Sequence, residues 1–358
     1  MIDEKNKIIY YDFSTGAVHQ ACKEKARLGN VMGWRLQRDD PKLSFGHAIH
    51  AGWAAYYDAL AGGFHSDDGK WYNFSIDVPP IVHAQAAFLR DLKVNDDGST
   101  TLPITLESEE RRSIERGLAL LDAYIYRWRN EPYVNILRED GSPLVEVGFQ
   151  FPLAQYGEYT LVYVGYIDRI MLNSATQRPI IIEGKTTTRA LSQYIEQAKP
   201  NSQITGYFKP ANTIVTALGL PEIKECVWDC MFISDRKPDM SKALLDRFWA
   251  YGIDTVKDFA RQTTTRSRTD VSEFLVDAEA WALDYAAWLM SGSRRWPRTA
   301  PGACHQYGGC QFRQRCSLNL DEAEEASYMA TFFKVDKWEP WRKIVERNPS
   351  MLPQLESM

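Results

Sequence analysis

Three polar side chains interrupt two otherwise apolar, β-rich stretches in the middle of the chain. Asp168 follows the run YTLVYVGYI, while Glu183 and Lys185 follow the run RPIII. Strands of this composition are expected to be buried on both faces of a sheet. A carboxylate there is costly to desolvate unless it is paired or bound to a cation. The two acids and the lysine therefore predict a divalent-metal site with an adjacent ammonium group.

The spacing of these residues indicates how such a site is built. Glu183 and Lys185 share one face of a strand, because side chains alternate with a period of two. Two carboxylates and the carbonyl of Gly184 can hold Mg²⁺ or Mn²⁺. A metal in this place acidifies its bound water and stabilises the transition state of phosphodiester hydrolysis, while Lys185 positions that water or neutralises charge. The alternative from this spacing alone is an exposed ion pair at strand ends.

Further residues occur in a fixed order around this set. They are Gly46 and His50 as G-x3-H on an expected helix, Gly165 and Asp168 as G-x-x-D on a strand, Glu183 and Lys185 as E-x-K, and Gln203 and Tyr207 as Q-x3-Y on a helix. Across residues 46–207 this order resembles the PD-(D/E)xK nuclease superfamily, and specifically its RecB-like exonuclease branch. Glu146 matches an acid often present one strand earlier, and Ile167 stands where the superfamily name has proline.

The resemblance implies a restriction-endonuclease-like fold, that is, an α/β (α+β) mixed β-sheet core flanked by helices. It implies a metal-dependent DNA exonuclease. The implied roles are metal ligation by His50, Asp168 and Glu183, to which the Gly184 carbonyl proposed above would be added, and catalysis by Lys185 together with Asp168 and Glu183. DNA binding or support of the site is implied for Gln203, Tyr207 and Glu146. For Gln203 and Tyr207 the alternative is a helix-face pair whose phenol belongs to the core.

The six cysteines fall into two groups. Cys226 and Cys230 lie in the expected strand ECVWDCMFIS. Positions i and i+4 of a strand are too far apart to bind the same metal ion, so both cysteines are expected in the core. In a reducing cytosol a cysteine cluster more often indicates a metal than a disulfide. The cysteines of the second group are Cys22, Cys304, Cys310 and Cys316.

The second group suggests a cofactor through the same family. Some RecB-like nucleases enclose the nuclease with a 4Fe-4S cluster held by one cysteine before the core and three after it. Cys22 lies before the expected core, and the three others lie after it. The family pattern ends C-x2-C-x5-C, whereas this chain has C-x5-C-x5-C. The resemblance implies a structural 4Fe-4S cluster; zinc, free thiols, and ligation by His305 remain alternatives.

The expected organisation is a single domain over residues 1–358. Its nuclease core covers about residues 40–235, and a cysteine-cluster region is formed by Cys22 and about residues 294–320. The helices expected from periodicity cover a segment capped by Ser14 and continuing through Cys22, then 42–60, 106–130, two segments divided near Pro200, and 271–292. A hairpin is expected at Asp140-Gly141 within 135–147, and a strand at 224–234.

Composition excludes some functions. An apolar content of 44% and a charged content of 25% are ordinary for a globular protein. The net charge of −5 neither favours nor excludes nucleic-acid binding, because Lys and Arg gather in residues 22–38 and 260–298. No apolar run approaches the roughly 20 residues of a membrane span. The N-terminal residues lack a signal-peptide pattern, so a cytoplasmic location is expected. The sequence has no P-loop, no G-x-S-x-G and no H-E-x-x-H motif.

The expected partner is DNA, in the form of linear single- or double-stranded ends. Phage and prophage recombination nucleases of similar size act beside a single-strand annealing protein, and others act with a helicase, so both are candidate protein partners. Three rival functions remain open. The chain is alternatively a CRISPR-adaptation-type RecB-like nuclease, a catalytically idle DNA-binding protein with the same fold, or an iron-sulfur redox protein.

Overall fold

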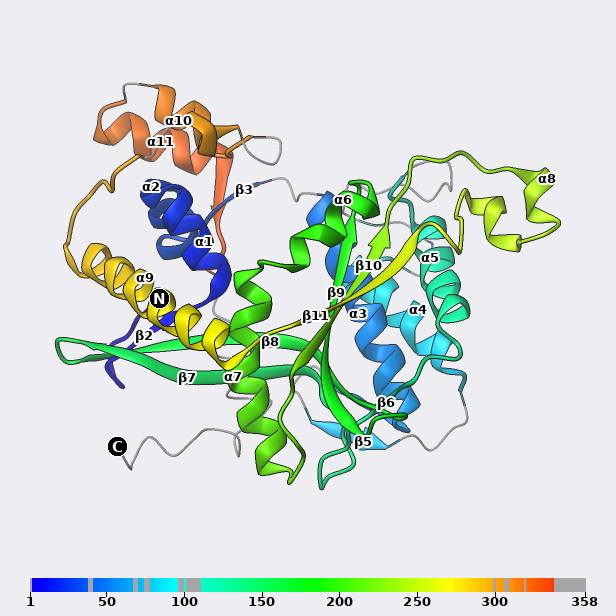
Figure 1. Cartoon of the computed structure of the whole chain (residues 1–358). Coiled ribbons are helices and arrows are strands. Elements are labelled where there is room, and N and C mark those ends of the chain that lie inside the picture. Colours follow the sequence, from blue (N-terminus) through cyan, green and yellow to red (C-terminus); the bar gives the residue numbers. More distant parts are fainter. Residues whose placement is uncertain are drawn as a thin grey trace. The chain divides into compact units, whose positions relative to one another are not determined.

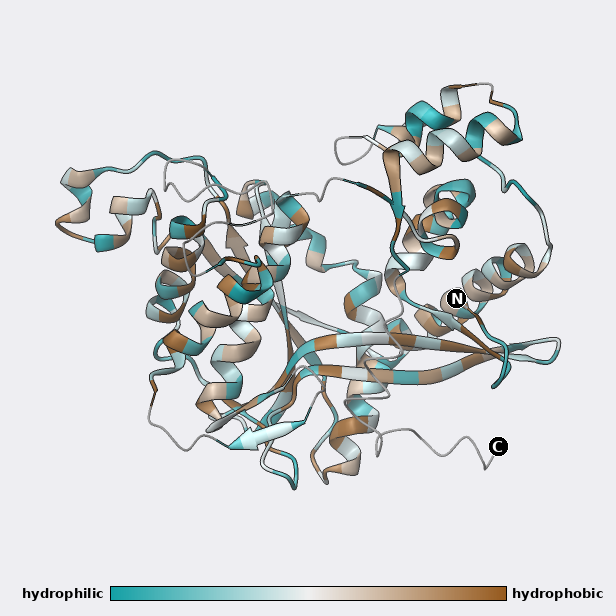
Figure 2. Cartoon of the chain, turned by 180° about the vertical axis from the view of Figure 1, so that it is seen from behind, coloured by the Kyte–Doolittle hydropathy of each residue, from teal (hydrophilic) through white to brown (hydrophobic). Residues whose placement is uncertain are grey.

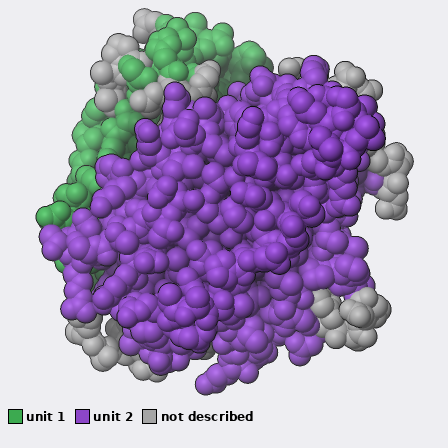
Figure 3. All heavy atoms as spheres, turned by 45° about the vertical axis from the view of Figure 1, so that its right-hand side comes forward, with its two compact units in different colours: residues 1–38, 148–165, 272–358 green, residues 39–147, 166–271 purple. Residues whose placement is uncertain are grey.

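The chain forms two compact units, which Figure 3 colours separately. Unit 1 comprises residues 1–38, 148–165 and 272–358, and unit 2 comprises residues 39–147 and 166–271. The computed structural model describes residues 2–37, 41–66, 70–73, 78–95, 100, 111–298, 301–305, 309–318 and 320–337. Strands β7 (Val145–Tyr156) and β8 (Tyr159–Asn173) contribute residues to both units.

Unit 2 is built on a mixed sheet in the order β8-β9-β10-β11 (Figure 1). β9 pairs antiparallel with β8 and parallel with β10, and β10 pairs antiparallel with β11. The strands added to β8 are β9 (Arg178–Thr187), β10 (Glu225–Phe232), β11 (Phe259–Thr265) and, on the other side of β8, β6 (Tyr133–Asn135). Residues 179–184 of β9 are all buried, which explains their almost uninterrupted apolar sequence.

Helices lie on both faces of this sheet. On one face Trp53 of α3 lies against Gly184 of β9, and on the other Gln203 of α7 reaches Glu183. The helices of unit 2 are α3 (Pro41–Leu60), α4 (Pro80–Asp91), α5 (Ile114–Arg127), α6 (Leu191–Ile195), α7 (Ser202–Ala217) and α8 (Met240–Ala243), with 3₁₀ turns η2 (Glu196–Ala198) and η3 (Arg247–Tyr251). A small sheet pairs β4 (Gly63–His65) with β5 (Trp71–Asn73). The mixed sheet flanked by helices confirms the fold class predicted from the sequence.

The core of unit 2 lies where α3, α4 and α5 pack together. Its centre contains fully buried aromatic and aliphatic side chains, among them Phe45, Ile49, Phe88, Leu121 and Tyr124. Ser113 caps α5 by accepting a hydrogen bond from the Arg116 N–H at 3.2 Å, so the helix begins later than the predicted residue 106. Residues 101–110 lie outside the described part of the chain.

The predicted hairpin at Asp140-Gly141 is smaller than expected. Gly141 adopts a φ of 86°, and the turn closes a single bridge between Leu137 and Pro143. The flanking strand β6 pairs with β8 instead of β7. The turn residues were therefore predictable, but the strand partners were not, because pairing is set by register between distant segments of the chain.

Unit 1 contains the two ends of the chain and the outer parts of β7 and β8. Its other strands are β1 (Ile2–Asp3), β2 (Ile8–Tyr11), β3 (Trp34–Leu36) and β12 (Phe333–Val335). Its helices are α1 (Phe13–Ala21), α2 (Lys23–Ala26), the π-helical η1 (Arg27–Val31), α9 (Arg268–Met290, which starts in unit 2), the 3₁₀ turn η4 (Pro301–Cys304), α10 (Arg313–Ser317) and α11 (Glu322–Phe332). β2 pairs in parallel with β8, and β3 pairs with β12.

The predicted first helix is wrong in its cap and in its continuity. Asp12 caps α1, because its carboxylate accepts the Thr15 N–H at 2.7 Å, and Ser14 lies inside the helix. The helix ends at Ala21, and Cys22 is extended with φ −163° and ψ 111° before α2 starts. A break at one residue leaves the apolar periodicity almost unchanged, which explains why the sequence did not predict it.

Hydropathy follows this architecture in both units. Figure 2 shows extended hydrophobic stretches along the long strands, alternating with polar residues toward their ends. Among the described helices, none combines the length and hydropathy needed to span a membrane.

The close packing of α4 against α5 gives a stability prediction. A Cβ atom on Gly117 would overlap the ring of Phe88. We expect Gly117→Ala to lower the free energy of unfolding by about 1–2 kcal/mol, because overpacking of about 1–3 kcal/mol outweighs the gain of up to about 1 kcal/mol in helix propensity. Urea denaturation measures the change. Phe88→Leu in the same chain should recover part of the loss, and a net stabilisation by Gly117→Ala alone would contradict this packing.

Candidate active site

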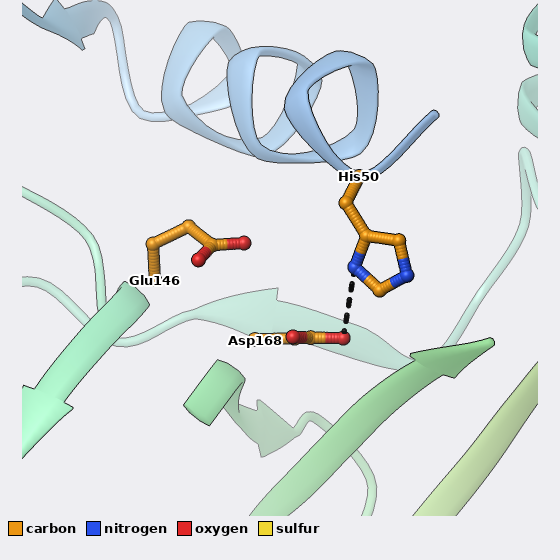
Figure 4. A group of neighbouring side chains, drawn as sticks. All are labelled: His50, Glu146 and Asp168. Carbon is orange, nitrogen blue, oxygen red and sulfur yellow. Dashed lines mark ion pairs between the residues drawn. The ribbon is translucent and has the colours of Figure 1, made fainter. Parts of the chain in front are cut away.

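Three potential metal ligands from separate elements converge in unit 2. His50 comes from α3, Glu146 from the start of β7 and Asp168 from β8, and Figure 4 shows them around a common space. One ligand atom from each lies within 4.8 Å of the others. His50 Nδ1 is 3.4 Å from Asp168 Oδ2. Both side chains are partly accessible, with exposed fractions of 26% and 16%, so a solvated cation can reach them.

Glu146 enters this group through an unusual backbone conformation. Its φ is 47°, a left-handed value that costs a residue with a side chain about 1–2 kcal/mol. Val145 and Val147 on either side are buried, which holds the segment in place. Strain of this kind often marks a functional site. The sequence predicted Glu146 as a supporting or DNA-binding residue, and its position makes it a candidate ligand.

The second acid of the predicted site is more deeply buried. Glu183 is 1% exposed, and its Oε1 accepts a hydrogen bond from Gln203 Nε2 at 3.1 Å and pairs with Lys185 Nζ. Gln203 Nε2 also donates to Tyr207 Oη at 2.6 Å. Within the described part of the chain, Glu183 Oε2 is buried without a hydrogen-bond partner. A buried carboxylate oxygen in this state is what a cation would satisfy, so the donor set fits a divalent metal.

Gly184 lies between the two halves of the site. Its N–H donates to Asp168 Oδ2 at 2.7 Å. A Cβ atom on this residue would lie 2.5 Å from the Trp53 ring, so only glycine fits here without displacing Trp53. The packing accounts for the glycine of the E-x-K motif, while the predicted ligation by its carbonyl stays a prediction.

Burial and neighbouring charges shift the pKa values of Asp168 and Glu183 in opposite directions. Burial alone would raise the pKa of Asp168, but His50, the Lys185 ammonium and the Gly184 N–H together lower that pKa to about 2. Burial and the nearby Asp168 charge raise the pKa of Glu183 to about 7, although Lys185 opposes the change. Asp168 is thus ionised at neutral pH, and Glu183 exchanges its proton there.

The two bases respond to the same acids. Burial lowers the pKa of His50, but Asp168 outweighs it and leaves the pKa of His50 above its usual value. Burial also opposes the charge on Lys185, and Glu183 and Asp168 outweigh it, so the pKa of Lys185 is raised. Lys185 is therefore an ammonium at neutral pH, with a proton that it does not readily release.

Three aromatic residues beside the site, Trp53, Tyr194 and Trp228, were missed from the sequence. The Trp53 ring centroid lies 5.1 Å from that of His50, one helical turn earlier. Tyr194 of α6 stacks on Trp228 with centroids 6.0 Å apart, and Lys185 Nζ lies 5.5 Å from the Trp228 ring centroid. The spacing of Trp53 from His50 was visible in the sequence, whereas the approach of Tyr194 depends on the turn after β9.

The cysteines also divide into two groups in space. Cys226 and Cys230 are buried in β10 as predicted, with exposed fractions of 0% and 1%. In unit 1, burial raises the pKa of the Cys310 thiol, and the nearby Cys316 and Cys22 thiols add to the increase. The Cys310 N–H also donates to the Cys304 carbonyl at 2.9 Å. The thiols of Cys22, Cys310 and Cys316 therefore lie near one another, but within the described part of the chain the four cysteines are not grouped closely enough to hold one ion in this arrangement.

A buried ion pair joins the chain segments that carry these thiols. Glu24 and Arg315 are 1% and 3% exposed, and Arg315 Nη1 donates to Glu24 Oε1 at 3.0 Å. Glu24 Oε2 also accepts the Trp296 N–H at 2.9 Å. Arg315 directly precedes Cys316, and Glu24 closely follows Cys22. The pair therefore holds the first and the last of the four cysteines in the same part of unit 1.

Comparisons with known proteins add little to this geometry. No protein-family model matches the chain, and no curated protein matches it. Among the solved structures that match is the crystal structure of a phage related exonuclease from Haemophilus somnus 129PT, which is 14% identical. The match covers 66% of this chain and 93% of the other, with a TM-score of 0.25. A TM-score this low carries no argument, so the function rests on the site.

The raised pKa of Glu183 gives a prediction on stability and pH. The extra stability from its bound proton is complete below its usual value of 4.5 and is lost as the pH rises through about 7. Glutamine at position 183 cannot ionise. We expect the stability of Glu183→Gln relative to the wild type to increase by about 2–3 kcal/mol from pH 5 to pH 8 in metal-free buffer.

Thermal melts at both pH values with a chelator present test this expectation. The exposed Glu139→Gln removes one carboxylate elsewhere in unit 2 and controls for net charge. A stability difference between Glu183→Gln and the wild type that does not change with pH would contradict the raised pKa.

Proposed function

We propose that the chain is a metal-dependent deoxyribonuclease that hydrolyses phosphodiester bonds, of the PD-(D/E)xK type, acting as an exonuclease on linear DNA ends. The observation that carries the proposal is the convergence of His50, Glu146 and Asp168 beside the Glu183–Lys185 pair. Carboxylates, an imidazole and an ammonium in one partly accessible place suit phosphoryl chemistry better than a structural ion pair.

The side chains of this site would have different roles in binding the metal and in hydrolysis. A bound Mg²⁺ or Mn²⁺ supplies a Lewis acid and an acidified water. Asp168, ionised at neutral pH, would hold the cation together with His50 and Glu146. Glu183 would contribute to the cation its Oε2, which has no partner among the described residues, or would take up a proton from the attacking water.

Lys185 has the role of a fixed charge. Its raised pKa keeps it protonated, so it stabilises the negative charge that develops on the phosphoryl oxygens. Gln203 holds Glu183 in place through its hydrogen bond, and Tyr207 in turn contacts Gln203. These two residues therefore support the site whether or not they also contact DNA.

We also propose that Cys22, Cys304, Cys310 and Cys316 hold a 4Fe-4S cluster, with zinc as the alternative. The cluster would join the two ends of unit 1 and contribute folding free energy, since its ligands are separated in the unfolded chain. It has no redox step in this mechanism. The proximity of Cys22, Cys310 and Cys316 and the buried Glu24–Arg315 pair support the proposal.

The proposed biological setting is recombination and DNA end processing in a phage, prophage or bacterium. DNA is the proposed substrate, a single-strand annealing protein or a helicase is the proposed partner, and the cytoplasm is the proposed location. A CRISPR-adaptation-type nuclease and a catalytically idle DNA-binding protein are the competing functions. The assays below separate the idle protein from an enzyme.

End-labelled linear DNA and closed circular DNA test the activity. With Mg²⁺ or Mn²⁺, protein purified without oxygen should digest the linear form and leave circles intact. Lys185→Ala should lower the rate at least about 100-fold, because it removes a charge that stabilises the transition state. Lys209→Ala, which removes an exposed lysine from α7, is the matched control and should retain the wild-type rate.

Other results would change the proposal in specific ways. Cutting of closed circles would show an endonuclease. Equal rates for the wild type and Lys185→Ala would remove the site from catalysis. Absence of digestion with either metal, together with DNA binding, would favour the idle DNA-binding protein.

Iron and acid-labile sulfide content tests the cysteine site. Wild-type protein purified without oxygen should contain both, whereas Cys310→Ala should lose them and melt at a lower temperature, because cluster binding contributes to folding. Cys226→Ala changes a buried cysteine in unit 2 and should keep the cluster. Zinc in place of iron would support the alternative metal, and normal stability with full activity in Cys310→Ala would disprove a structural cluster.

A further inference from the structure

Six polar side chains lie together in unit 2 beside the candidate metal site, four of them buried and two, Glu131 and Arg261, about one-tenth exposed. We call them the buried network; they are Tyr57, Tyr124, Glu131, Arg169, Asp229 and Arg261. Asp229 is 0% exposed and Arg169 is 2% exposed, so both ions are removed from water. None of the six belongs to the motifs that predicted the active site.

Asp229 is the centre of the buried network. Its Oδ2 accepts hydrogen bonds from Arg169 Nη2 at 3.0 Å, Arg261 Nη2 at 3.1 Å and Tyr124 Oη at 2.5 Å. Three donors on one oxygen fix the relative positions of β8, β10, β11 and α5. The carboxylate is thereby paired, and the two guanidinium groups are brought close together.

Glu131 balances the second guanidinium. Its Oε2 accepts from Arg261 Nη1 at 2.6 Å, and its Oε1 accepts from Tyr57 Oη at 2.8 Å. The network therefore contains two positive and two negative charges. Tyr57 lies on α3, the helix that also carries His50, so the hydrogen bonds extend from the strands to that helix.

The buried network is attached to the backbone of the candidate site. Arg169 directly follows Asp168 on β8, and Asp229 lies opposite Gly184 in the register of β9 and β10. Arg261 lies opposite Asp229 in the register of β10 and β11. Asp168 contacts His50 of α3, and Arg169 approaches the Tyr57 ring of the same helix at 4.4 Å. A shift in the network would therefore move the strands that carry the metal ligands.

Trp53 connects the buried network with His50. Its ring centroid lies 5.0 Å from that of Tyr124 and 5.1 Å from that of His50, and the Arg169 guanidinium lies 5.9 Å from it. The same ring occupies the space that a Cβ on Gly184 would need. The Trp53 ring is therefore packed between the buried network, β9 and the imidazole of His50, which lies 3.4 Å from Asp168.

Stability alone is a weak reason for burying these charges. Apolar side chains of similar volume often replace a buried ion pair with no loss, or a gain, in stability. We propose that the buried network is a positioning device, which holds Trp53 and thereby His50 in place against Asp168 and so sets the metal affinity of the site. This inference rests on the proposed metal site, and it makes Trp53, Arg169 and Asp229 positioning residues.

The double variant Arg169→Met/Asp229→Leu tests the inference, because it removes one charge of each sign and leaves Arg261 paired with Glu131. Mn²⁺ binding is measured by calorimetry without DNA, alongside the melting temperature. We expect a melting temperature at or above that of the wild type, with Mn²⁺ affinity about 10- to 100-fold weaker, the usual loss when residues that support metal ligands are changed. A folded double variant that binds Mn²⁺ like the wild type overturns the inference.

A second variant decides the case if the double variant does not fold. Trp53→Phe keeps an aromatic ring but makes it smaller, so it fills less of the space beside His50. Trp249→Phe is its control, since Trp249 contacts Arg236 and Lys242 in a different part of unit 2. The inference is supported if Trp53→Phe binds Mn²⁺ more weakly than the wild type while Trp249→Phe does not. It is overturned if Trp53→Phe binds Mn²⁺ as tightly as the wild type, or no more weakly than Trp249→Phe.

Asp168→Asn separates this inference from the proposed function. It should abolish Mn²⁺ binding. If the wild type binds no Mn²⁺, or Asp168→Asn binds it unchanged, the proposed metal site is wrong and the inference falls with it. If Asp168→Asn loses binding while the network variants keep it, only the positioning role is wrong.

Discussion

Two neighbouring carboxylates in one sheet, the buried Glu183 and the 16% exposed Asp168, carry charge that the surrounding residues of unit 2 must compensate. Asp168 is stabilised as an anion by His50, by Lys185 and by the Gly184 N–H. Glu183 receives Lys185 and Gln203 on one oxygen and keeps the other buried without a partner among the described residues. Metal-free protein is therefore left with an incompletely compensated acid, which is the condition that favours cation binding.

The two faces of the sheet contribute different residues to the site. On one face α7 supplies Gln203, which contacts Glu183. On the other face α3 and α5 cover the buried network and Trp53, and α3 also brings His50 to Asp168. Asp168 and Arg169 are neighbours on β8, so one strand carries both a candidate metal ligand and a member of the buried network.

The sequence predicted the parts of this arrangement that depend on local pattern. The apolar run before Glu183 predicted a buried central strand, and the helical spacing of 42–60 predicted α3 to within a residue. The position of Glu146 was not predictable in the same way, because its left-handed φ leaves no mark on periodicity. Asp229 and Arg261 meet Arg169 only through strand register, and one sequence without homologues carries little information on register.

The most direct test of the account is a crystal structure of the protein soaked in Mn²⁺, with the metal located from its anomalous scattering. The account predicts a peak among His50, Glu146 and Asp168, at ligand distance from Asp168 and at least one of the other two. The carboxylate of Glu183 is expected to lie next to it. A peak elsewhere in the chain, or no peak at a Mn²⁺ concentration that supports digestion of DNA, would contradict the central claim.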